Sequence, residues 1–217
     1  MKTHIYKDNQ AVAKAFAKYL AKQITKAPIF HIALSGGSTP KVLFEILAKD
    51  YADKIDWLKV HLYWGDERCV PFNDADSNFG MTEEKLLQHI DFPSTNIHRV
   101  IGQNKPSHEA IRYSNIINNY LPSKNNLPVF DLIILGMGSD GHTASIFPHQ
   151  MELMTDENTC GVATHPESGQ KRITLNGPVI NNAKQIHFLV TGASKAPVVK
   201  KIFNKSRGYK KLSLIHI

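Results

Sequence analysis

The feature that most constrains the fold is a regular alternation of short apolar runs and segments with helical periodicity. The short runs at 29–34, 60–64 and 130–135 are typical of strands that are covered on both faces. Later strands are expected at 172–175 and 185–190. Helices are expected at 9–26, 40–49, 78–89, 107–120 and 194–203. The alternation predicts an α/β fold, a three-layer, mostly parallel, doubly wound sheet with helices on both faces.

Polar, glycine-rich segments follow the predicted strands. In such sheets, ligands bind beyond the carboxyl ends of the strands. We therefore expect one ligand site where four loops meet: 35–40, 65–68, 136–142 and 191–195. The length of 217 residues, with 42% hydrophobic residues, suits one domain with a full core and excludes disorder as the main state.

The loop after the first strand is rich in glycine and hydroxyl groups: Ser35, Gly36, Gly37, Ser38 and Thr39. Thr39 is expected to be the N-cap of the next helix, with Pro40 in the first turn. Backbone N–H groups and the helix dipole at such a place favour a phosphate or another anion. The loop lacks the P-loop and dinucleotide fingerprints, so a tight turn without a ligand is the alternative.

Charged residues stand near three other strands. Asp66 and Arg68 follow the second strand, and an arginine offers a planar fork for phosphate or sugar hydroxyls. Arg172 begins a later strand, and Lys195 lies in the loop after Val190. These four residues are candidate substrate-binding groups. The alternatives are a local ion pair for the first two and solvated surface charges for the others.

The segment 136–142 (GMGSDGH) carries the candidate general base. Histidine titrates near neutrality, and His142 follows a buried strand and a glycine turn. Asp140 stands two residues earlier, where it can orient the ring or keep it basic. Ser145 is not a convincing nucleophile because the Gly-x-Ser-x-Gly elbow is absent.

Together these segments resemble the 6-phosphogluconolactonase family. The resemblance rests on 35–40 (SGGSTP), 64–71 (WGDERCVP), 77–78 (SN), 135–148 (LGMGSDGHTASIFP), 172–175 (RITL) and 191–196 (TGASKA). It covers residues 5–205 in the right order, and the segment that ends at Phe147 and Pro148 is the most specific.

The resemblance implies hydrolysis of 6-phospho-D-glucono-1,5-lactone to 6-phospho-D-gluconate in the oxidative pentose phosphate pathway. It implies the fold of glucosamine-6-phosphate deaminase and ribose-5-phosphate isomerase, and neither a metal nor an organic cofactor. In this interpretation His142 activates water and Asp140 tunes it. The 35–39 loop, Arg172 and Lys195 bind the 6-phosphate, and Arg68 or backbone N–H groups stabilise the oxyanion.

Three other functions are alternatives. A sugar-phosphate isomerase or deaminase of the same fold is disfavoured because 145–148 (SIFP) has no glutamate where the deaminase has Phe-Asn-Glu-Pro. A non-catalytic sugar-phosphate-binding module usually carries a DNA-binding domain, for which there is no room before residue 5. A nucleic-acid binder is suggested only by the net charge of +7.

The charge excess is local. Seven of the 26 Lys and Arg residues lie in 195–211, which has no Asp or Glu, so residues 1–194 carry no net charge. Residues 212–217 match the translation of a sequencing-library adapter. We therefore expect residues 212–217 to be a non-native tail, and a natural short tail is the alternative. Residues 1–211 are then expected to form one domain that lacks its native C-terminal segment. The sequence has two cysteines, no signal peptide and no long apolar stretch, which predicts a cytoplasmic protein. We expect neither a nucleic-acid nor a membrane partner, and a monomer or weak homodimer.

Overall fold

The computed structural model describes residues 2–217 and is built on a four-stranded parallel sheet. Its strands are β1 (Phe30–Leu34), β2 (Val60–Trp64), β6 (Leu132–Leu135) and β9 (Ile186–Phe188), in the order β2-β1-β6-β9. Every residue of β1 and β6 is buried, as their apolar runs predict for strands covered on both faces. The parallel pairing confirms the predicted sheet.

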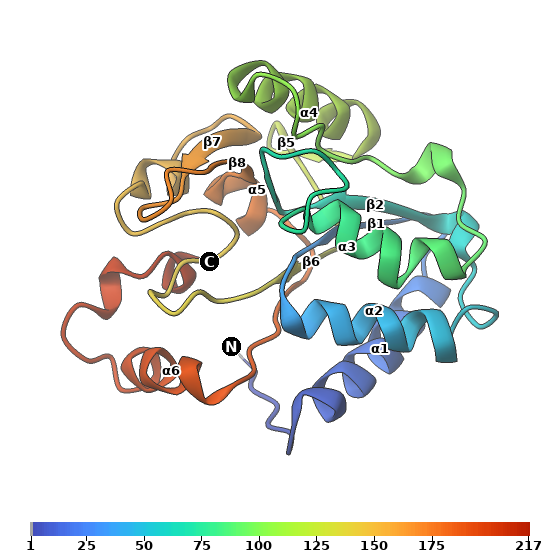
Figure 1. Cartoon of the computed structure of the whole chain (residues 1–217), viewed down its shortest axis with the longest axis horizontal. Helices are drawn as coiled ribbons and strands as arrows, with labels where there is room; N and C mark the ends of the chain where they lie inside the picture. The colour runs from blue at the N-terminus through green and yellow to red at the C-terminus, as the bar shows by residue number, and fades with distance from the viewer. Residues whose placement is uncertain (1) are drawn as a thin grey trace.

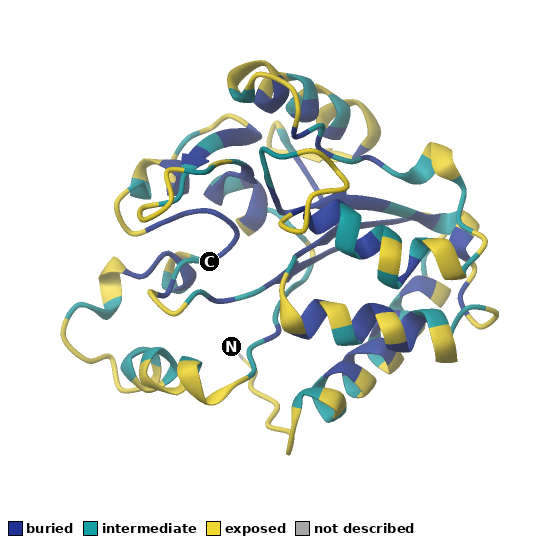
Figure 2. Ribbon diagram, viewed as in Figure 1, coloured by how far each residue is buried: buried dark blue, intermediate teal, exposed yellow. Residues whose placement is uncertain are grey.

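One face of the sheet is covered by α1 (Asn9–Thr25), α2 (Ser38–Asp50) and α3 (Asn78–Lys85) (Figure 1). The carboxylate of Asp8 caps α1 by accepting the N–H of Ala11 at 2.7 Å. The buried sides of these helices turn toward the strands, and their exposed sides face outward (Figure 2). The segment predicted as one helix at 78–89 ends at Lys85 and continues as a 3₁₀ turn, Leu87–His89.

The opposite face is covered by α4 (Pro106–Tyr120), α5 (Gly177–Asn181) and a second, antiparallel sheet (Figure 1). That sheet has the order β3-β8-β7 and consists of β3 (Asp66–Arg68), β8 (Lys171–Leu175) and β7 (Cys160–Thr164). Helices on both faces confirm the doubly wound architecture. The predicted strand at 172–175 exists, but it belongs to this second sheet, because β8 pairs with the extended chain that leaves β2.

The remaining elements are short. A small hairpin, β4 (Ser123–Lys124) and β5 (Leu127–Pro128), turns through Asn125 and Asn126, which both have positive φ. The helix α6 (Ala196–Phe203) has no buried residue, and no helix within residues 2–217 is long and apolar enough to span a membrane. Further 3₁₀ turns are Trp57–Lys59, Ser94–Asn96, Met151–Met154, Ala193–Lys195, Tyr209–Lys211 and Ser213–His216.

The last residues of the chain pack against the loop that follows β6. Leu212 and Ser213 are buried, and the hydroxyl of Ser213 accepts the N–H of Thr143 at 3.0 Å. The side chain of Leu212 lies so close to Gly141 that a Cβ at this glycine would meet it at 2.5 Å. Residues 212–213 therefore support the backbone of the 136–143 loop.

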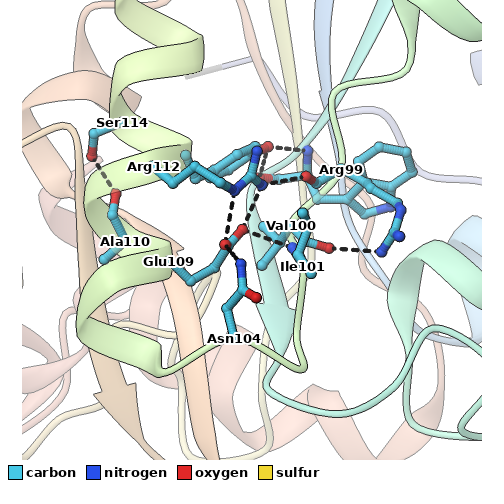
Figure 3. Close-up of polar contacts among 10 residues, drawn as sticks. Arg99, Val100, Ile101, Asn104, Glu109, Ala110, Arg112 and Ser114 are labelled. Carbon is cyan, nitrogen blue, oxygen red and sulfur yellow. Dashed lines mark hydrogen bonds and ion pairs between the residues drawn. The ribbon is translucent and has the colours of Figure 1, made fainter.

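A buried carboxylate at the start of α4 supports the chain behind β3. Glu109 accepts the Ile101 N–H, the Asn104 amide and the Arg112 guanidinium, whose Nη2 also donates to the Arg99 carbonyl (Figure 3). Burial alone raises the pKa of Glu109, but these hydrogen bonds together outweigh burial and lower the pKa.

The segment held by Glu109 lies directly against β3. A Cβ at Gly102 would lie 2.7 Å from the carbonyl oxygen of Arg68 and 2.2 Å from that of Val70. Only a residue without a side chain allows this approach. The Glu109 network therefore fixes the backbone that carries Arg68.

Three histidines cluster at the side of the sheet next to α4. The rings of His61 and His98 are 5.3 Å apart and nearly parallel, and His61 Nδ1 lies 3.0 Å from His98 Nε2. His31 packs 4.9 Å from His61, and Tyr63 stacks on His98 at 4.5 Å. Burial lowers the pKa of all three histidines.

Candidate active site

A pocket of about 300 Å³ lies at the carboxyl ends of the parallel strands. All four predicted loops contribute to it. Of the residues predicted to form the site, Asp140 alone does not line the pocket; those that do are Ser35, Gly36, Gly37, Ser38, Thr39, Asp66, Arg68, His142, Arg172 and Lys195.

The 35–39 loop forms the first wall and leads into α2. The N-cap is Gly37, whose φ of +108° favours glycine, so the prediction that Thr39 caps the helix is wrong. Thr39 lies one residue inside the helix, and its hydroxyl is 2.7 Å from that of Thr191, which ties this loop to the one after β9. The first-turn N–H groups of Ser38 and Thr39 have no partner within the helix and suit an anion.

Asn78 is a pocket residue that the site prediction missed. Its amide donates to the carbonyl of Asp66 at 2.8 Å, and a Cβ at Gly36 would lie 1.8 Å from its Oδ1. Glu67 positions it, because the buried Glu67 carboxylate accepts the N–H groups of Asn78 and Phe79 at 2.8 and 2.7 Å. The one sequence signal for Asn78 was the Ser-Asn pair at 77–78, which is among the motifs that carry the family resemblance.

Two arginines lie side by side on neighbouring strands of the second sheet. Arg68 in β3 and Arg172 in β8 are directly paired, and both line the pocket. Among the residues that the structure describes, neither buried Nε atom has a hydrogen-bond partner. Burial lowers the pKa of Arg172, and Asp66 opposes this effect. A guanidinium group stays charged nonetheless, so this wall places two positive charges beside the pocket.

Asp66 supplies negative charge beside these arginines. Its carboxylate is buried, and its Oδ2 accepts the hydroxyl of Ser145 at 2.6 Å. The N–H of Ser145 donates to Thr174 Oγ1 at 3.2 Å. Ser145 therefore uses its hydroxyl and its amide to join the 136–147 loop to β3 and β8, which agrees with the prediction that it is no nucleophile.

His142 and Asp140 form a hydrogen-bonded pair. His142 Nδ1 lies 2.6 Å from Asp140 Oδ1, and since a carboxylate only accepts, Nδ1 carries the proton and Nε2 is left as the basic nitrogen. Burial alone raises the pKa of Asp140, but the hydrogen bond and charge of His142 bring it down to about 2. A Cβ at Gly138 would lie 2.2 Å from His142 Nδ1, so this turn requires glycine.

Lys195 completes the pocket from the segment that follows β9. It ends the 3₁₀ turn Ala193–Lys195, directly after the segment 189–191 that lines the same wall. The site thus combines three cations, helix N–H donors and an oriented imidazole. Within residues 2–217, no three His, Cys, Asp or Glu side chains gather in a way that could hold a metal ion.

Comparison with known proteins agrees with this site. A sequence model described as glucosamine-6-phosphate isomerases/6-phosphogluconolactonase matches residues 7–212. The chain belongs to this family. The 6-phosphogluconolactonase of Treponema pallidum is 42% identical over 202 residues, which are 93% of this chain and 84% of the relative. The enzyme of that name from Haemophilus influenzae is 48% identical over 193 residues, 88% of this chain and 81% of the relative.

Solved structures place the chain in the same family. The crystal structure of a devB protein is 46% identical, with a TM-score of 0.89 over 92% of this chain and 84% of that one. The 6-phosphogluconolactonase of Thermotoga maritima is 26% identical, with a TM-score of 0.85 over 99% and 93%. These matches and the family model confirm the resemblance and fold class predicted from the sequence.

Proposed function

We propose that this chain hydrolyses 6-phospho-D-glucono-1,5-lactone to 6-phospho-D-gluconate. The observation that carries the proposal is the His142–Asp140 pair in a pocket with two arginines whose buried Nε atoms have no partner among the described residues. A base beside cationic side chains suits hydrolysis of an anionic ester. The names of the relatives from Treponema pallidum and Haemophilus influenzae support this reaction.

In the proposed mechanism, His142 is the general base. Asp140 holds Nδ1–H, which leaves Nε2 to take a proton from water. The water oxygen attacks the lactone carbonyl to give a tetrahedral oxyanion. Collapse of this intermediate breaks the bond to the ring oxygen, which receives the proton from His142. A positioned base contributes about 10²- to 10⁴-fold in rate.

The other pocket residues bind the substrate and stabilise the charge that develops on it. The N–H groups and hydroxyls of the 35–39 loop, Arg172 and Lys195 bind the 6-phosphate, and Arg68 stabilises the oxyanion. Asp66 accepts a sugar hydroxyl. Phosphate binding acts equally on substrate and transition state, so its loss raises KM, whereas the base acts on kcat.

The test is a spectrophotometric assay with lactone generated enzymatically, read against spontaneous hydrolysis. The wild-type rate must exceed that background. We expect His142→Ala to lower kcat by about 10²- to 10⁴-fold and Arg172→Ala mainly to raise KM. Near-normal turnover of His142→Ala would show that another group is the base.

A sugar-phosphate isomerase or deaminase reaction is the alternative within this family, whose model covers both activities. The segment 145–148 has no acid to open a sugar ring with His142. Ammonia release from glucosamine 6-phosphate is the direct test, and we expect none. A cytoplasmic location stays a prediction that cell fractionation will test. A monomeric or weakly dimeric state stays a prediction that light scattering will test.

A further inference from the structure

A buried aromatic ring contacts both the proposed base and one of the proposed phosphate ligands. Phe147 is fully buried at the end of the loop that carries His142. Its ring centroid lies 4.6 Å from that of His142, with 56° between the planes. The guanidinium carbon of Arg172 lies 5.6 Å from the same centroid. Both distances are in the range where an aromatic face attracts an edge or a cation.

Among the described residues, the side chains of both groups make few hydrogen bonds. The His142 side chain is 21% exposed, and its one side-chain hydrogen bond within residues 2–217 goes to Asp140, which is itself 40% exposed. The buried Nε of Arg172 has no partner in the same part of the chain. Contact with a rigid ring therefore restricts both the imidazole and the guanidinium.

The ring itself is firmly placed. Ser145, two residues earlier, is bonded to Asp66 and to Thr174, so the backbone before the ring is fixed to the second sheet. The ring of His165 packs against Phe147 at 5.3 Å with its plane nearly perpendicular. The second sheet thus determines where the Phe147 ring lies, and the ring in turn determines where the His142 imidazole lies.

We propose that Phe147 is a positioning residue for the lactone hydrolysis, whose ring sets His142 and Arg172 relative to each other. When Arg172 binds the phosphate of a substrate molecule, the His142 imidazole is then in place to act at the lactone carbonyl of that same molecule. This inference rests on the proposed function. It predicts that loss of the ring changes turnover and substrate affinity together, although Phe147 does not line the pocket.

The experiment compares Phe147→Leu with Phe130→Leu. Phe130 is equally buried, belongs to the same hydrophobic core and lies outside the pocket lining, so both changes leave a similar cavity. With folded protein quantified by circular dichroism, Phe147→Leu is expected to lower kcat about 10- to 100-fold and to raise KM. Phe130→Leu is expected to keep both constants. Equal constants for the two variants would overturn the proposal.

A double-mutant cycle isolates the contact with Arg172. Arg172→Ala removes the guanidinium, so adding Phe147→Leu to it is expected to raise KM no further. Additive effects on KM would show that the ring does not act through Arg172. If Phe147→Leu does not fold, Phe147→Met fills the space with a flexible side chain and takes its place in both comparisons. A wild-type protein without lactonase activity would refute the proposed function instead.

Discussion

Acidification is expected to destabilise the fold through the cluster of His31, His61 and His98. The side chains of His31 and His98 are 7% and 6% exposed, and burial lowers the pKa of each from 6.5 to about 4. For His31, nearby Asp131 opposes this effect, whereas His61 and Lys184 add to it. The fold therefore holds both rings neutral, and protonation favours the unfolded chain.

The magnitude follows from linkage. A pKa that is lower in the folded state contributes stability above the unfolded value of 6.5, and this stability is lost as the pH falls toward 4. Each proton changes the free energy of unfolding by about 1.4 kcal/mol per pH unit. Between pH 7 and pH 5 the loss is about 2 kcal/mol for each ring.

Urea unfolding at pH 7, 6 and 5 measures this slope. His98→Gln removes one of these titrating groups, so the free energy of unfolding of the variant is expected to fall by about 2 kcal/mol less than that of the wild type between pH 7 and pH 5. The matched control is His108→Gln, at an exposed position of α4, which is expected to keep the wild-type slope. Equal slopes for His98→Gln and wild type would refute the argument.

Three further predictions concern the supports of the pocket. Glu67→Ala leaves the N–H groups of Asn78 and Phe79 without their acceptor. The variant is expected to lose about 3 kcal/mol of the free energy of unfolding, which thermal unfolding will show as a fall of about 6–12 °C in Tm. Gly36→Ala forces the Asn78 amide from the Asp66 carbonyl and is expected to raise KM in the lactone assay; an unchanged KM would contradict this role of Asn78. Ser213→Ala removes the acceptor of the Thr143 N–H and is expected to lower the free energy of unfolding in urea by about 1–3 kcal/mol.

The strongly patterned elements were predictable from the sequence. The apolar run of β6 and the amphipathic spacing of α1 and α4 led to predictions within a few residues of the observed bounds. The short strand β3 was missed because its residues, Asp66 to Arg68, are charged and gain their conformation from pairing with β8. No local pattern states which sheet a strand joins, so the place of β8 was not predictable.

The pocket was predictable to the extent that it depends on strand ends. The carboxyl ends of parallel strands meet at one edge, which placed the 35–39 loop, His142 and Lys195 together. Asn78 was missed because it reaches the pocket through the fold-back of the chain after β3, fixed by the buried carboxylate of Glu67. Such a tertiary contact has no periodicity to reveal it.

The strand order β2-β1-β6-β9 also governs when the site can form. Strand β1 lies between β2 and β6, and its partner Leu132 is separated from Ile32 by a hundred positions. Long closures of this kind are slow, and a chain made from the N-terminus meets them late. During synthesis the edge of β1 stays open until β6 emerges, and Lys195 joins the pocket later still. The pocket is therefore completed only after β9 and Lys195 have emerged, and until then the apolar edge of β1 can pair with another chain.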